Sequence, residues 1–229
     1  MKKLFYASLI LLLLFQSSCT MVIKGLVKTV VKGYNNHTEM NVSSFQLADQ
    51  EGKKHSFASL YAGKTVYFYV WASKSNRPPG EKNEDYIALK KRFAKYSDVV
   101  FADFYIGTDQ AAWTADDQKN AGQNSYFLIQ DEASKKFFAA LKESTMVPFI
   151  IGKDGKMLAF KGPKAQDHTL VDYVLYEARN GLDGTAAAKT LIRGVDSDQK
   201  FKTQLLKDWY QGHFNKSPEK VNFSVSSTQ

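Results

Sequence analysis

Cysteine is almost missing from this chain of 229 residues, in which Cys19 is the only one. Enzymes that exchange thiols and disulfides need a reactive thiolate, and Cys19 lies outside the region where the sequence predicts a fold. Histidine is also scarce. The four histidines are His37, His55, His168 and His213, and they stand too far apart to match metal-ligand spacing, so each is predicted to be a surface or turn residue. We therefore predict no cysteine pair in the domain, no metal site and no cofactor.

Other catalytic signatures are absent as well. There is no glycine-rich phosphate loop and no Gly-x-Ser-x-Gly elbow. The paired acids Asp116-Asp117 and Asp131-Glu132 are typical of helix ends and solvated faces. The formal net charge is +8, but the lysines are scattered along the chain. A scattered charge of this kind argues against nucleic acid binding.

Aromatic side chains, by contrast, make up 14% of the sequence. They build either an aromatic-rich core or an exposed binding surface. The core is the simpler interpretation, and the surface is kept as an alternative. The apolar content of 44% and the charged content of 24% are those of an ordinary globular protein.

The first 18 residues are typical of a secretion signal. Two lysines precede an apolar stretch from Leu4 to Phe15, which is too short to span a membrane comfortably, and small residues lead to Cys19. This pattern looks like a bacterial lipoprotein signal, in which Cys19 becomes the lipid-modified first residue. It predicts a lipid-anchored protein of the cell envelope. Gln16 departs from the aliphatic residue usual at its position, so cleavage after Ser18 without lipid, or an uncleaved anchor, remain alternatives.

Residues 19–42 are predicted to form a membrane-proximal tether. Apolar pairs recur near helical spacing at Val22-Ile23, Leu26-Val27 and Val30-Val31, which indicates a short amphipathic segment. Such a segment lies either on lipid or on the folded domain, and the pattern leaves both open.

An unbroken run of β-branched and aromatic residues extends from Thr65 to Trp71. It predicts a central strand that is covered on both faces. Pro78 and Pro79 then fit the first turn of a helix, where a missing N–H costs nothing. The junction between this strand and this helix is where an enzyme with this arrangement of elements would have its catalytic residues.

The sequence at this junction resembles the active-site segment of the thioredoxin superfamily, in its TlpA-like and peroxiredoxin-like branch. The family signature is Trp-Ala-Ser-x-Cys-x-x-Cys, and Trp71-Ala72-Ser73 matches its start. The two family cysteines fall on Ser75 and Pro78, so both thiols are missing. A serine hydroxyl at the start of a helix does not ionise near neutral pH, unlike a cysteine. Trp71, Ser75 and Pro78 are therefore interpreted as degenerate active-site positions with no catalytic residue among them.

A second segment with family resemblance is Val147-Pro148, followed by a short strand and an Asp154-Gly155 turn. Thioredoxin-like proteins carry a cis proline at the start of the strand that faces the active site. The resemblance implies a cis bond before Pro148 and a groove in which the backbone at Val147 pairs with an extended segment of a partner. A trans proline that begins a strand is the alternative. Asp-Gly is a strong hairpin signal.

The predicted fold is α/β, a thioredoxin-like domain at residues 43–181 with a central mixed sheet and an N-terminal hairpin. Amphipathic periodicity and turn signals predict its other elements. These are a hairpin over 45–57 with a helical turn to 61, helices over 81–96, 109–121, 133–142 and 168–180, and strands over 99–106 and 126–129.

The rest of the chain exceeds the family's minimal domain. Residues 182–214 are predicted to form a helical extension, with helices over 185–192 and 197–210. Phe201, Leu205 and Trp209 form a stripe in the second helix that is predicted to dock on the domain. Residues 215–229 are predicted to form a flexible tail.

Three functions of different classes follow from these observations. The first is a thioredoxin-like lipoprotein without redox chemistry, held on the membrane by Cys19, that binds a protein or peptide in the groove at Val147 and Pro148. The second is a thiol-disulfide oxidoreductase or peroxiredoxin-related enzyme of the envelope, which the single cysteine argues against. The third is a structural envelope component that assembles through the C-terminal helices and an exposed aromatic surface.

Overall fold

The computed structural model describes most of the chain beyond the predicted signal and tether. The described residues are 31, 34, 37–72, 83–117, 124–141, 147–219 and 221. Cys19, Ser75 and Pro78 lie outside them. Among the helices in these ranges, none combines the length and the apolar character needed to cross a membrane.

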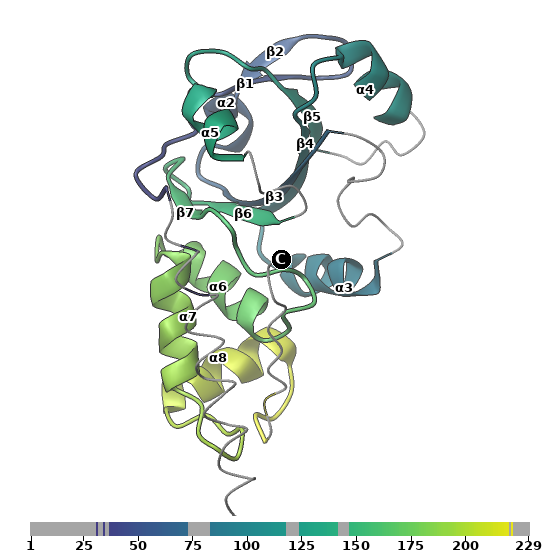
Figure 1. Cartoon of the computed structure of the whole chain (residues 1–229). Helices are drawn as coiled ribbons and strands as arrows, with labels where there is room; N and C mark the ends of the chain where they lie inside the picture. Colours follow the sequence, from purple (N-terminus) through teal and green to yellow (C-terminus); the bar gives the residue numbers. More distant parts are fainter. Residues whose placement is uncertain are drawn as a thin grey trace, which may run out of the picture.

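A seven-stranded sheet forms the centre of the fold (Figure 1). Its strands are β1 (Gln46–Ala48), β2 (Lys54–Ser56), β3 (Thr65–Trp71), β4 (Val99–Tyr105), β5 (Ser125–Leu128), β6 (Pro148–Ile151) and β7 (Met157–Ala159). They are arranged in the order β2-β1-β5-β4-β3-β6-β7. Strands β3, β4 and β5 are parallel, whereas the β1-β2 and β6-β7 pairs are antiparallel and each extends one edge of the sheet.

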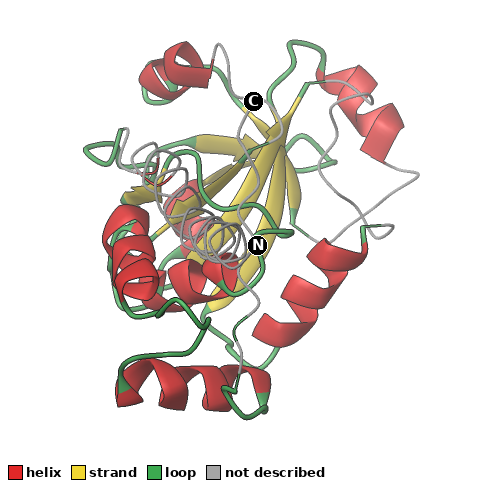
Figure 2. Ribbon diagram, turned by 60° about the horizontal axis from the view of Figure 1, so that its bottom comes forward, coloured by secondary structure: helices red, strands yellow, loops and turns green. Residues whose placement is uncertain are grey.

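Helices cover both faces of this sheet (Figure 2). They are α2 (Phe57–Tyr61), α3 (Glu84–Phe93), α4 (Gln110–Asp117), α5 (Lys135–Ala140), α6 (Leu170–Ala178), α7 (Gly184–Arg193) and α8 (Gln204–Phe214). In Figure 1, α3, α6, α7 and α8 lie below the sheet, and α2 and α5 lie above it.

The connection β3-α3-β4, followed by the antiparallel β6-β7 pair and α6, is the arrangement of a thioredoxin-like fold. The predicted fold class is therefore confirmed, including the N-terminal hairpin and the extra C-terminal helices. The central strand has the predicted bounds, and all seven of its residues are buried. Its side chains alternate between two cores, as a strand covered on both faces requires. Tyr67 and Tyr69 belong to the core under α6 and α8, and Val66, Phe68 and Val70 to the core under α2 and α5.

Local hydrogen bonds explain several element boundaries. The Asp109 carboxylate accepts a hydrogen bond from the Ala112 N–H at the start of α4, as predicted for a helix cap. Ser56 caps α2 in the same way through the Ser59 N–H. The Asp154-Gly155 turn joins β6 to β7, and Gly155 has a φ of 78°, which a residue with a side chain rarely adopts.

The C-terminal extension differs from the prediction in register. Helix α8 begins at Gln204 rather than near residue 197. The carboxylate of Asp196 accepts hydrogen bonds from the N–H groups of Asp198 and Lys200, so this stretch closes into a turn that competes with the helix. The buried residues of α8 are Leu206, Trp209 and His213. Leu205 was predicted to dock on the domain, but it is 65% exposed.

The segment before the first strand packs on the domain. Val31 and Tyr34 are each 1% exposed. The Thr185 hydroxyl donates to the Val31 carbonyl at 2.7 Å, and the Phe160 N–H donates to the Tyr34 carbonyl at 3.2 Å. Of the apolar pairs on which the amphipathic pattern rests, Val31 is the one described residue, and it packs on protein.

The aromatic side chains of the described residues lie mainly in the core. Within these residues, Ile87 and Leu205 are the only large hydrophobic side chains that are exposed. An exposed aromatic surface, the alternative kept above, is therefore not found in the described part of the chain. Val221, which the sequence places in the tail, is fully buried and donates its N–H to the Gln199 carbonyl.

Candidate functional site

The predicted groove residues come together where β3 ends and β6 begins. Pro148 is the first residue of β6 and pairs with Tyr69 of β3, two residues before Trp71. Trp71 and Val147 are 0% and 6% exposed, and Pro148 is also buried. These side chains consequently support the surface at this end of the sheet and do not themselves form an open groove. Ser75 and Pro78 fall outside the described residues.

The prediction of a cis bond before Pro148 is wrong. No peptide bond among the described residues is cis, and Val147 and Pro148 are both described. The trans form is the intrinsically favoured one, by about 0.5–1 kcal/mol. A proline in the trans form is acceptable at the first position of a strand, where no N–H is needed for pairing. The Pro148 carbonyl instead accepts a hydrogen bond from the Gly162 N–H at 2.8 Å.

A half-buried carboxylate holds Trp71 in place. The indole N–H of Trp71 donates to Asp103 Oδ1 at 2.9 Å, and the Ser125 hydroxyl donates to the same atom at 2.8 Å. These three residues belong to the neighbouring strands β3, β4 and β5. The ring of Tyr105 packs edge-on against Trp71 at 4.8 Å between centroids. The end of the sheet at Trp71 is thus a fixed platform.

A pair of tyrosines lies under the same part of β3. The Tyr67 hydroxyl donates to the Pro163 carbonyl at 3.0 Å and lies 3.3 Å from the Tyr69 hydroxyl. Burial raises the pKa of Tyr67 well above its ordinary value, and burial is also the main cause that raises the pKa of Tyr69 to about 12. Both phenols therefore remain protonated at neutral pH, and neither is poised to act as a general base.

A second polar centre, not foreseen from the sequence, lies between α3, α6 and α8. Asp172 of α6 is fully buried. It accepts hydrogen bonds from Arg92 Nε at 2.6 Å and from Arg92 Nη2 at 2.8 Å, and His213 Nε2 lies 2.8 Å from its Oδ1. The hydroxyl of Tyr96 lies 3.1 Å from His213 Nδ1. We call these four residues the Asp172 network.

The Asp172 network corrects the prediction for one histidine. His213 is 4% exposed and its ring stacks on Trp209 and Tyr96. Burial alone would raise the pKa of Asp172, but the hydrogen bonds from His213 and Arg92 outweigh it and the pKa is lowered. His213 follows Trp209 by four residues, so the helical apolar stripe was the sequence signal that it faces the domain.

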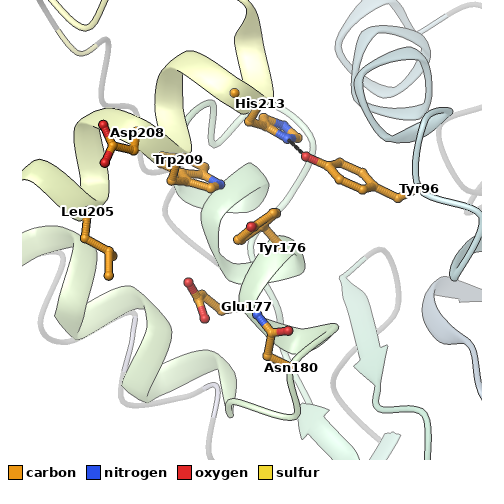
Figure 3. Close-up of a pocket in the computed structure, with 9 residues that line it drawn as sticks. Tyr96, Tyr176, Glu177, Asn180, Leu205, Asp208, Trp209 and His213 are labelled. Carbon is orange, nitrogen blue, oxygen red and sulfur yellow. Dashed lines mark hydrogen bonds between the residues drawn. The ribbon is translucent and has the colours of Figure 1, made fainter.

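A hollow of about 830 Å³ borders the Asp172 network. Leu205 and Asp208 line it from α8, and Glu177 and Asn180 line it from α6 and the residues just after it (Figure 3). The rings of Tyr96, Tyr176, Trp209 and His213, together with Gly212, complete its wall. A volume of this size is typical of sites for small molecules or single side chains. We call this feature the α6-α8 hollow.

Metal ligation has no support in the described residues. They include no group of three or more His, Cys, Asp or Glu side chains placed to hold an ion. Of the remaining histidines, His55 and His168 each pair with one carboxylate, on Asp49 and Asp85 respectively. His37 lies in a turn with a φ of 62°.

Comparison with protein-family models gives no match, and comparison with curated proteins gives none either. Solved structures do show similarity. A thiol-disulfide oxidoreductase from Bacteroides fragilis NCTC 9343 is 18% identical with a TM-score of 0.42, covering 62% of this chain and 95% of that chain. BsSco, a member of the Sco family of cytochrome c oxidase assembly proteins, is 18% identical with a TM-score of 0.41, covering 64% and 94%.

The thioredoxin domain of a thiol-disulfide oxidoreductase from Bacteroides vulgatus is 14% identical, with a TM-score of 0.39, and the match covers 52% of this chain and 84% of that domain. At these values the likeness carries no argument about activity. What the site does has to be inferred from the residues of this chain.

Proposed function

We propose that this chain is a thioredoxin-like lipoprotein of the cell envelope that binds a protein partner and does not turn over disulfides. The observation that carries the proposal is the cysteine count. Cys19 is the only cysteine, and it precedes every described residue of the domain. Thiol-disulfide exchange requires a thiolate that attacks a sulfur atom. Without a cysteine after the central strand, this fold retains the scaffold of such an enzyme but not its reactive group.

The membrane partner in this proposal is lipid attached to Cys19. The short apolar stretch before it and the absence of any other cysteine support this assignment. Val31 and Tyr34 pack on the domain. The anchor would therefore hold the domain close to the membrane, because Val31 is only twelve positions beyond Cys19 in the sequence.

The protein partner in this proposal binds at the end of the sheet formed by Trp71, Val147 and Pro148. Two hydrogen bonds to Asp103 immobilise Trp71 and its neighbour Ser125, so the surface above them is rigid. A rigid surface lowers the entropy lost on binding. Because the three side chains are buried, they act as support, and the contacts would come from the backbone and from adjacent residues such as Ala72.

This binding site can be tested by photo-crosslinking. A photoreactive residue in place of Ala72, in the membrane-bound chain, is expected to give one discrete adduct that also forms under reducing conditions. The matched control is the same residue in place of Glu132, whose side chain is 88% exposed next to α5. A Cys19→Ser version should lose the adduct if the anchor brings the partner near. Equal labelling from both positions, or none from Ala72, would refute the site.

A further inference from the structure

The α6-α8 hollow combines acidic groups with an aromatic wall. Glu177 and Asp208 present carboxylates from two different helices (Figure 3). None of the described residues that line the hollow is a lysine or an arginine. The Glu177 carboxylate accepts a hydrogen bond from Tyr173, and after burial it is the main cause that raises the pKa of that phenol. The hollow is thus a negatively charged feature in a chain whose formal net charge is +8.

Two cations beside the ring of Tyr96, Arg179 and Lys95, already have partners. Arg179 Nε donates to Asp98 at 2.8 Å. Lys95 Nζ donates to the carbonyls of Gly212 and His213 at the end of α8. Neither of them supplies a counter-charge to Glu177 or Asp208 through a hydrogen bond in the described structure. The Asp208 carboxylate accepts a hydrogen bond from the neutral Gln204 amide at 2.7 Å, and the Glu177 carboxylate accepts one from Tyr173. Neither of these donors is charged, so both carboxylates can still attract a cation from outside.

The aromatic wall already attracts a guanidinium group from within the chain. The Arg179 guanidinium carbon lies 4.1 Å from the centre of the Tyr96 ring and 5.5 Å from that of the Tyr176 ring. Tyrosine and tryptophan rings attract cations to their faces, and the rings of Tyr176 and Trp209 also line the hollow. Leu205 adds an exposed apolar side chain at the rim, which suits an aliphatic stem.

One donor in the wall lacks an acceptor. Trp209 is 7% exposed, and its indole N–H has no hydrogen-bond partner in the described structure. A buried donor without a partner destabilises the folded state. An oxygen atom that reaches it from the hollow would remove this cost. The site therefore favours a ligand that combines a cation, an aliphatic stem and a nearby carbonyl oxygen.

A basic residue in a polypeptide has this combination of groups. We propose that the α6-α8 hollow binds an arginine or lysine side chain of a protein or peptide partner. Glu177 and Asp208 bind its charged end, Leu205 contacts its stem, and the Trp209 N–H donates to a backbone carbonyl beside it. This site uses other helices than the sheet end at Trp71, so it does not depend on the partner proposed there.

The test uses the full chain and a capped tripeptide, acetyl-Gly-Arg-Gly-amide. Its matched control has citrulline, which keeps the shape of arginine without the charge. Binding is followed by calorimetry and by the indole N–H resonances in NMR, with Trp209 assigned by a Trp209→Phe variant. We expect the arginine peptide to bind about tenfold more tightly than the citrulline peptide and to shift the Trp209 resonance. The affinity of the arginine peptide should fall as salt is added.

The double variant Glu177→Gln, Asp208→Asn should lose about tenfold in affinity for the arginine peptide, because both charges that attract it are gone. Glu132→Gln, at an exposed carboxylate away from the hollow, should leave it unchanged. Circular dichroism and the melting temperature show whether each variant is folded. Equal binding of both peptides, stronger binding of a glutamate peptide, or no binding at millimolar concentration would each overturn the proposal.

Discussion

Replacing Asp172 with alanine is expected to lower the free energy of unfolding by about 3–5 kcal/mol. The substitution leaves the Arg92 guanidinium and the His213 ring without the carboxylate that both contact, and His213 is fully enclosed. Urea denaturation followed by circular dichroism measures the loss. Asp172→Asn is the matched control, because it keeps an acceptor for one of the two donors and should lose less. A loss below about 1 kcal/mol, the value typical of exposed ion pairs, would show that the Asp172 network does not stabilise the packing of the C-terminal extension on the domain.

The same carboxylate makes stability depend on pH. The pKa of Asp172 is lowered in the folded state, so its contribution is complete above the ordinary aspartate value of about 3.9. The contribution disappears as the pH falls through the lower, folded value. Asp98 adds to this trend. Burial alone would raise the pKa of Asp98, but hydrogen bonds from Arg179 and Lys153 outweigh burial and lower this pKa to about 2. Stability should therefore fall between about pH 4 and pH 2, and Asp172→Asn should make that fall smaller.

Replacing Tyr34 with alanine is expected to cost about 3–5 kcal/mol, the range for large aromatic residues removed from a core. Tyr34 is 1% exposed and packs in the core that also contains α6 and α7. Tyr34→Phe is the informative control. The Tyr34 hydroxyl is buried without a hydrogen-bond partner in the described structure, so its removal should be neutral or stabilising.

Urea denaturation of both variants and of the native chain measures these changes in the free energy of unfolding. If Tyr34→Ala were as stable as the native chain, the segment before residue 37 would not be part of the folded unit, and it would be free to lie on the membrane. If Tyr34→Phe were as destabilised as Tyr34→Ala, the hydroxyl would have a partner that the described residues do not provide.

The parts of the fold that the sequence predicts are those that local chemistry determines. The buried strand from Thr65 to Trp71 follows from an unbroken apolar run, the cap at Asp109 from a short side chain before a helix, and the turn at Gly155 from its freedom to adopt positive φ. Each of these signals lies within a few residues of the structure it specifies.

The parts that were missed have different causes, and one of them depends on residues far apart in the chain. His213 is buried because Asp172, 41 residues earlier, supplies a carboxylate at 2.8 Å, and neither residue alone indicates the pair. Helix α8 begins late because Asp196 bonds its own neighbours. The cis bond expected at Pro148 came from resemblance to a family whose proline faces a redox site. In this sequence a serine and a proline stand where the family signature has its two cysteines.

The sequence also does not indicate that the residues of the α6-α8 hollow lie together. Glu177 and Asp208 stand on different helices and look like ordinary solvated charges when each is considered alone. Leu205 was assigned to the buried stripe of α8, although it is exposed at the rim of the hollow. Only the crossing of α6 and α8 brings these side chains around one space (Figure 3).

The central claim, that this is a thioredoxin-like scaffold without its redox couple, is tested most directly by reduction of insulin disulfides. The assay compares the native chain with the double variant Ser75→Cys, Pro78→Cys, which restores a cysteine at each family position. We predict that the native chain is inactive and that the variant reduces insulin. Activity in the native chain would contradict the claim, because catalysis would then proceed without a thiol in the domain, and a folded but inactive double variant would contradict the placement of the lost couple.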